Sequence, residues 1–148
     1  DCEGTLKIAD FGVAEEVSRF DESDLVSKSR GSPAFQPPEV AIGQESFSGF
    51  AVDVWAAGVS LFLLTTGKVP FEGSSLMHLF ERIATGVYSI PERIRTDRTL
   101  VDLIHGLLHI DPAKRLTAAG ALRHPWLAGL RNGMDTRTEM ATASEGSI

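Results

Sequence analysis

Apolar residues recur with a helical period through much of the second half of the chain. The stripe that begins at Leu76 predicts a helix that Ser74 or Ser75 caps and Gly86 ends. A second stripe over residues 100–108 predicts another amphipathic helix, because its leucines and isoleucine recur every three or four positions. One face of each helix should therefore pack on a common core.

The most apolar run of the chain extends from Val52 to Thr66, and Gly67 is a plausible end for it. A helix that is apolar nearly all round normally lies inside the fold. The run is shorter than the roughly 20 apolar residues that a bilayer span needs. We therefore expect a fully buried core helix here and no membrane span.

Shorter elements complete the predicted organisation, which is mainly α. Residues 39–43 and 117–122 should form short helices, and residues 6–9 a short strand. Residues 17–30 are rich in Ser, Asp and Glu, which predicts a mobile surface loop. Residues 128–148 are small and polar without periodicity, which predicts a disordered tail.

Composition narrows the class of protein. The chain has 148 residues, of which 43% are hydrophobic and 23% charged, as in a globular domain. The net charge of −6 argues against nucleic-acid binding, which usually needs a clustered basic face. The single cysteine, Cys2, excludes an intrachain disulfide and fits a reducing compartment, so we expect an intracellular protein, cytoplasmic or nuclear. The acidic, turn-like start is unlike a signal peptide.

Two motifs carry the main chemical information. Asp10-Phe11-Gly12 follows the predicted strand, and Pro37-Pro38-Glu39 follows the polar loop. This order is the layout of a protein-kinase activation segment, in which the Asp of D-F-G holds Mg²⁺. Taken alone, Asp10 is better interpreted as a turn aspartate at the end of a strand. The pairing of both motifs makes the turn the weaker interpretation.

Over residues 1–127 the chain resembles the C-terminal lobe of eukaryotic serine/threonine kinases. The resemblance rests on five elements: Asp10-Phe11-Gly12, Gly31-Ser32, Pro37-Pro38-Glu39, Asp53-Val54-Trp55-Ala56-Ala57-Gly58 and Asp111-Pro112-Ala113-Lys114-Arg115. More narrowly, Gly12-Val13-Ala14-Glu15, the segment 31–39 and Phe47-Ser48-Gly49-Phe50 look like the liver kinase B tumour-suppressor family. That family acts upstream of AMP-activated protein kinase.

The resemblance implies roles for residues of the activation segment. Asp10 would be a metal ligand, and Phe11 and Gly12 would belong to the same switch region. The segment Ser32, Pro33, Ala34 and Phe35 would shape the pocket that follows the phosphoacceptor. Ser32 could instead be an ordinary turn serine. Pro37 stands where most kinases have alanine, and Phe35 where many have tyrosine; both suit the narrower family.

Further residues would hold the lobe together or bind partners. Glu39 and Arg115 match a pair that forms a buried salt bridge, although two solvated charges are a common alternative. Asp53 would accept backbone N–H bonds from the catalytic loop, whereas Trp55 and Gly58 are packing residues.

The loop between the two motifs contains one large apolar residue and several serines. The apolar residue, Phe20, is either an anchor for a scaffold partner or a local packing residue. Ser23, Ser27, Ser29 and Ser32 could accept phosphate, although solvated serines are the favoured interpretation.

Several kinase motifs do not occur in these residues. There is no glycine-rich phosphate loop, no V-A-I-K lysine and no H-R-D-x-x-x-x-N catalytic loop. We therefore expect no catalytic base in this chain, and expect the missing motifs to precede residue 1 in a longer kinase that uses ATP and Mg²⁺.

Two functional hypotheses remain. The first is part of a serine/threonine kinase that phosphorylates other kinases, with a pseudokinase and a helical-repeat scaffold as partners. The second is a non-catalytic binding module of the pseudokinase type. A catalytic loop upstream of Asp1 in the coding sequence would favour the first hypothesis, and its loss the second.

Overall fold

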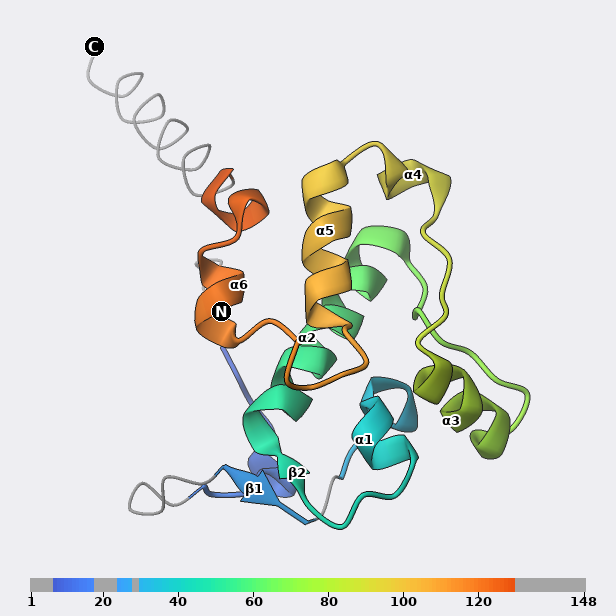
Figure 1. The fold of residues 1–148 in the computed structure, drawn as a ribbon, viewed down its shortest axis with the longest axis vertical. Helices are drawn as coiled ribbons and strands as arrows, with labels where there is room; N and C mark the ends of the chain where they lie inside the picture. Colours follow the sequence, from blue (N-terminus) through green and yellow to red (C-terminus); the bar gives the residue numbers. More distant parts are fainter. Residues whose placement is uncertain (1–6, 18–23, 28–29, 130–148) are drawn as a thin grey trace, which may run out of the picture.

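The computed structural model describes residues 7–17, 24–27 and 30–129, and this part of the chain is mainly helical (Figure 1). The other helices lie around one long central helix, α2, and a two-stranded sheet lies at one end. In chain order the elements are η1 (Phe11–Val13), β1 (Leu25–Val26), η2 (Pro33–Phe35), α1 (Pro38–Ala41), β2 (Phe47–Ser48), α2 (Gly49–Thr66), α3 (Leu76–Thr85), α4 (Glu92–Arg95), α5 (Arg98–Leu107) and α6 (Ala118–Leu122).

Helix α2 is the central element, as the apolar run predicted, and it begins three residues earlier than expected. Ser48 is its N-cap, because the Ser48 hydroxyl accepts a hydrogen bond from the Ala51 amide at 3.1 Å. Gly67 ends the helix in the left-handed conformation, with φ 77°. Glycine adopts this conformation without the steric penalty of a side chain, which explains the sharp stop.

The core forms where one face of α2 meets α5 and the chain around α3. Trp55, Val59 and Phe62 are buried on that face, and Phe71 stacks on Trp55 with ring centroids 5.7 Å apart. Burying each side chain of this size contributes about 1.5–3 kcal/mol relative to exposure. The hydrophobic face therefore holds α2 at the centre of the lobe.

Gly58 allows α2 and α5 to approach closely. A Cβ atom at this position would lie 2.8 Å from Leu107 Cβ and 2.9 Å from Leu108 Cδ2. Real Cβ atoms do not make contacts that short, so a larger residue would push the helices apart. The expectation that Gly58 and Trp55 are packing residues agrees with this geometry.

The two amphipathic stripes form the predicted helices. Ser75 caps α3 through a hydrogen bond from the His78 amide at 3.2 Å, and Gly86 ends the helix with φ 65°. Leu100 and Ile104 are buried on α5. The sequence analysis missed α4, whose four residues are too few for a visible period.

Two predictions for the N-terminal region were wrong. Of the strand predicted over residues 6–9, the described residues 7–9 are not in a strand. The loop predicted over residues 17–30 contains the strand β1, which pairs antiparallel with β2 so that Leu25 faces Ser48 and Val26 faces Phe47. Residues 18–23 and 28–29 of that loop lie outside the described residues.

The prediction of a fully buried α2 was also wrong, because one face of the helix is open. Phe50 is 65% exposed and Leu64 82%, and Asp53 and Ala57 are also exposed. An apolar cavity of about 740 Å³ opens beside this face, between α2 and α6. A contiguous apolar surface of this kind usually marks a place where other protein packs.

Helix α2 is long and apolar enough to cross a membrane, but core helices of soluble proteins often have the same length and composition. Its buried residues pack on α5 and the α3 region, which favours the interpretation as a core helix.

At the end of the described chain, residues 125–129 are helical. The rest of the tail predicted to be disordered, residues 130–148, lies outside the described residues.

Candidate functional site

Asp10 has an unusual backbone conformation. Its φ is 63° and its ψ 71°, and it is the one non-glycine residue with positive φ in the described ranges. Aspartate tolerates this region better than most residues, yet the conformation is still sparsely populated. Backbone strain of this kind clusters at functional sites, where surrounding structure maintains it. The outlier therefore coincides with the residue that the motif marked as a metal ligand.

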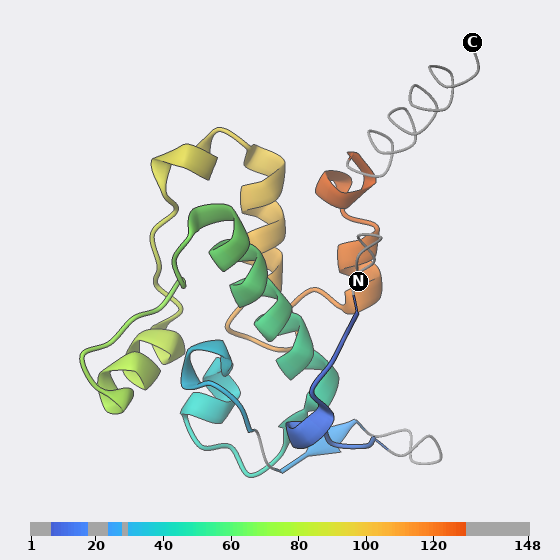
Figure 2. The same cartoon turned by 180° about the vertical axis from the view of Figure 1, so that it is seen from behind.

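The residues after Asp10 form the short helix η1 at the surface. Phe11 is 69% exposed, and the Ala14 amide closes the turn by donating to the Phe11 carbonyl at 3.1 Å. A Cβ atom on Gly12 would lie 3.4 Å from Asp10 Oδ1, an ordinary van der Waals contact. η1 lies near the two-stranded sheet when the molecule is seen from behind (Figure 2).

The candidate substrate-pocket segment is a second short helix, η2. The Phe35 amide donates to the Ser32 carbonyl at 3.0 Å, and Pro33 occupies the first helical position. Phe35 packs against the core around α2, whereas Ser32 and Pro33 are exposed. Pro37 is fully buried directly after it. The segment thus presents an exposed hydroxyl from a backbone that is anchored in the core.

Glu39 and Arg115, 76 residues apart, form the expected buried ion pair. Arg115 Nη1 and Nη2 donate to the two carboxylate oxygens of Glu39, each at 2.8 Å. The two side chains are 1% and 2% exposed. Such a bidentate pair fixes geometry more surely than it adds stability, because desolvation offsets much of the attraction. It therefore fixes the end of the activation segment against the loop after α5.

Arg115 has further partners that complete its hydrogen bonding. Its Nη1 donates to the Ala51 carbonyl at 2.8 Å, and its Nε to the His109 carbonyl at 3.0 Å. The guanidinium carbon lies 5.0 Å from the centroid of the Trp55 ring, a cation–π distance. One side chain thus joins α1, the first turn of α2 and the chain before α6.

Other predicted site residues are not assembled by the described structure. Asp53 is exposed on the open face of α2, and its carboxylate makes no hydrogen bond within the described residues. The predicted partner contact Phe20 lies outside the described residues, as do the candidate phosphate acceptors Ser23 and Ser29. Asp10 and Asp53 are both exposed.

A divalent cation fits the chemistry of Asp10 without a dedicated cluster. The described residues contain no group of three or more potential metal-ligating side chains. Mg²⁺ usually takes only one or two protein carboxylates and completes its shell with water and phosphate oxygens. A single exposed carboxylate is consistent with that kind of site.

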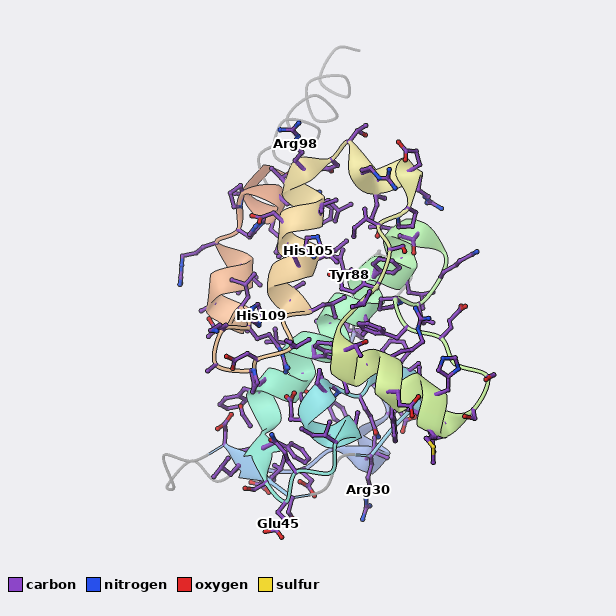
Figure 3. The ribbon with its side chains drawn as sticks, turned by 45° about the vertical axis from the view of Figure 1, so that its right-hand side comes forward. Arg30, Glu45, Tyr88, Arg98, His105 and His109 are labelled. Carbon is purple, nitrogen blue, oxygen red and sulfur yellow. The ribbon has the colours of Figure 1, made fainter. Side chains whose placement is uncertain are left out.

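Several polar contacts were not predicted from the sequence. The Asp97 carboxylate caps α5 by accepting from the Leu100 amide at 3.0 Å and also accepts from Trp126 Nε1 at 3.1 Å. Tyr88 and His105 point toward each other, with 2.9 Å between the Tyr88 hydroxyl and His105 Nδ1 (Figure 3). An aspartate directly before a helical stripe could have revealed the cap. Nothing in the sequence pairs Tyr88 with His105.

Comparison with known proteins places this geometry in a family. The model of the protein kinase domain matches residues 1–127. The chain therefore belongs to the protein kinase domain family, as the five motifs indicated. Its helices, activation segment and Glu39–Arg115 pair constitute part of such a domain.

Within that family, the relatives are named serine/threonine-protein kinase STK11, another name for liver kinase B. The chain is 50% identical to the Xenopus laevis protein over 133 residues, which are 90% of this chain and 30% of that protein. It is 50% identical to the human protein over 123 residues, 83% of this chain and 28% of that protein. The Dictyostelium discoideum homolog is 45% identical over 121 residues, 82% of this chain and 20% of its own length. The chain thus spans less than a third of these relatives.

Proposed function

We propose that this chain is the C-terminal part of the catalytic domain of a serine/threonine protein kinase. The kinase transfers the γ-phosphoryl group of ATP to a serine or threonine hydroxyl of a protein. The observation that carries the proposal is Asp10, an exposed carboxylate in a strained backbone conformation at the start of an activation segment.

Asp10 would hold Mg²⁺ beside the nucleotide phosphates. Phosphoryl transfer is catalysed mainly by positioning and by neutralisation of the charge on the phosphate oxygens, and the metal ion supplies part of that neutralisation. The chain's own contribution is to present the exposed Asp10 carboxylate. The anchored segment Ser32–Phe35 would receive the residue that follows the phosphoacceptor.

The substrates we propose are threonines in the activation loops of other kinases, relatives of AMP-activated protein kinase. This proposal rests on the similarity to STK11 and on the segment 31–39, whose residues suit that family. The proposed partners are a pseudokinase and a helical-repeat scaffold, with Phe20 as one contact. The proposed compartment is the cytoplasm or the nucleus.

The 148-residue chain should not catalyse the reaction alone. The sequence contains no H-R-D-x-x-x-x-N motif, so the catalytic base and a second metal ligand would come from a longer protein. The open face of α2, with Phe50, Asp53 and Leu64 exposed, is a surface on which such residues would pack. Asp53 would then accept backbone N–H bonds from the catalytic loop.

A phosphotransfer assay tests the function. The full-length protein, assembled with its partners, should phosphorylate an activation-loop peptide that contains threonine. The Asp10→Asn variant should lose at least about a hundredfold of that activity, the order of loss that follows removal of a strong electrostatic contact in a transition state. The 148-residue chain should show no turnover. Turnover by this chain alone would disprove the need for groups from a longer protein, and full activity of Asp10→Asn would disprove the role of Asp10.

The alternative is a non-catalytic binding module that docks partners through the same lobe. The exposed apolar face of α2 is the observation that favours it. A full-length protein that binds its partners but never transfers phosphate, with or without Asp10, would support the module.

A further inference from the structure

The N-terminus of α2 is capped by a residue from the activation segment, far away in the sequence. The first amides of a helix have no partner within the helix. Here the Gly49 amide donates to the Asp24 carbonyl at 2.8 Å, and the Phe50 amide donates to Asp24 Oδ2 over a longer 3.4 Å. The Ala51 amide donates to Ser48 Oγ, and the Ser48 hydroxyl donates to Asp24 Oδ2. Asp24 and Ser48 together satisfy the amides of the first turn.

The charge of Asp24 also suits this place. The N-terminus of a helix carries a partial positive charge, and a carboxylate there is stabilising. Helix α2 has 18 residues, so its dipole is well developed. A neutral acceptor would satisfy the amides but would lack this electrostatic contribution.

The backbone around Asp24 is fixed as well. Strand β1 follows directly and pairs with β2, which places Leu25 opposite Ser48. A Cβ atom on Gly49 would lie 3.3 Å from the Asp24 carbonyl oxygen and 3.5 Å from Val26 Cγ1. The glycine therefore lets the activation segment lie directly against the start of α2.

The same turn of α2 holds the other end of the activation segment. Arg115 donates to the Ala51 carbonyl at 2.8 Å while it pairs with Glu39. The chain from Asp24 to Glu39 is thus fastened at both ends to the first turn of α2. The candidate substrate-pocket segment, Ser32–Phe35, lies between the two attachments.

We propose that Asp24 is a positioning residue for the substrate pocket, an inference that rests on the proposed kinase function. It touches neither the phosphates nor the acceptor. It holds the early end of the segment in place, as the Glu39–Arg115 pair holds the late end. When the early attachment is lost, the pocket segment spends less time in the binding-competent arrangement, and apparent affinity for protein substrate falls by that fraction.

Kinetics of the full-length protein test this role. Removal of an N-cap typically shifts an equilibrium by a factor of about five. Asp24→Ala should therefore raise KM for the protein substrate, by at most about fivefold, and leave KM for ATP and kcat within about twofold of wild type. Asp24→Asn keeps the acceptor oxygen, and asparagine caps helices about as well as aspartate, so it should restore most of the affinity. Glu92→Ala, in an exposed ion pair with Arg95, is the matched control and should change nothing.

Hydrogen exchange in the same protein provides a second test, which does not depend on catalysis. In wild type, the Phe50 amide should exchange more slowly than the Met77 amide in the first turn of α3. In Asp24→Ala the amides of Gly49 and Phe50 should exchange about five times faster, and in Glu92→Ala they should not change. If Asp24→Ala is insoluble, two measurements still test the proposal: the comparison of the Phe50 and Met77 amides in wild type, and the kinetics of Asp24→Asn.

The possible failures are distinguishable. Absence of phosphotransfer by the wild-type protein would refute the kinase function, whatever exchange shows. An active wild type in which Asp24→Ala has unchanged KM for protein substrate would refute the positioning role alone. A kcat loss without a KM change would also refute it, because Asp24 would then act on the chemical step. Unprotected amides at Gly49 and Phe50 in wild type would remove its structural basis.

Discussion

Substitution of Arg115 by methionine should destabilise the lobe strongly. The change removes the guanidinium from Glu39, whose side chain is 2% exposed, and leaves a buried carboxylate without its partner. Removing one partner of a buried pair typically costs about 3–5 kcal/mol. The Ala51 and His109 carbonyls also lose their donors. Since a whole domain is stable by only about 5–15 kcal/mol, this single change should bring it near unfolding.

The double variant Glu39→Met/Arg115→Met should be less damaging than Arg115→Met alone. It removes the unpaired carboxylate. Replacement of a buried ion pair by apolar residues often leaves the free energy of unfolding unchanged. The Ala51 and His109 carbonyls remain without donors, and each unsatisfied carbonyl costs up to about 3 kcal/mol of stability. We therefore expect the double variant to recover roughly 1–3 kcal/mol relative to the single one.

Pulse proteolysis in urea, applied to the full-length protein, measures these free energies of unfolding. Arg95→Met is the control, because its pair with Glu92 is exposed and should contribute below about 1 kcal/mol. If Arg115→Met lowers the free energy of unfolding no more than this control does, the buried pair does not stabilise the lobe as proposed. It also fails if the double variant is less stable than the single one, since Glu39 would then not be the group left unsatisfied.

Three further predictions concern packing and pH. Gly58→Ala should destabilise the lobe by about 1–3 kcal/mol, because the new Cβ would lie 2.8 Å from Leu107 Cβ. This loss should exceed the gain of about 1 kcal/mol in helix propensity. An unchanged urea midpoint would contradict this prediction. Hydrogen bonds from the Leu100 amide and from Thr99 lower the pKa of Asp97 below its ordinary 3.8, so its contribution to stability is present above pH 3.8 and is lost as pH falls through the lower folded value. Asp97→Asn should flatten the acid limb of a stability–pH curve, and an unchanged limb would refute the assignment. Burial raises the pKa of Tyr88 above its ordinary 10, so stability should decline as pH rises past 10. The chain has one tyrosine, so at pH 11 the folded chain should show less phenolate absorbance than the unfolded chain, and equal absorbance would refute the assignment.

Long periodic elements were predictable from the sequence, and short or paired ones were not. The stripes of α3 and α5 bury enough apolar surface to decide their structure, so cap residues such as Ser75 and Gly86 appeared where expected. The four residues of α4 carry no period, and β1 exists because β2 lies beside it. The strand expected over residues 6–9 failed in its described part for the converse reason, since no strand pairs with it there.

The candidate site divides in the same way. The resemblance predicted the Glu39–Arg115 pair, which the structure contains, because both residues stand in recognisable motifs. The motif order also predicted Asp10 as a metal ligand, and this stays a prediction. The contacts of Asp24 could not be predicted, because a carboxylate in a polar loop looks like any solvated charge. The open face of α2 could not be predicted either, since an apolar run does not reveal which of its faces the same chain will cover.

Metal-dependent nucleotide binding tests the central claim most directly. Full-length wild-type protein should bind ATP more tightly when Mg²⁺ is present, and in Asp10→Asn this Mg²⁺ effect should disappear while binding of metal-free ATP stays the same. An equal Mg²⁺ effect in wild type and Asp10→Asn would contradict the assignment of Asp10 as the metal ligand.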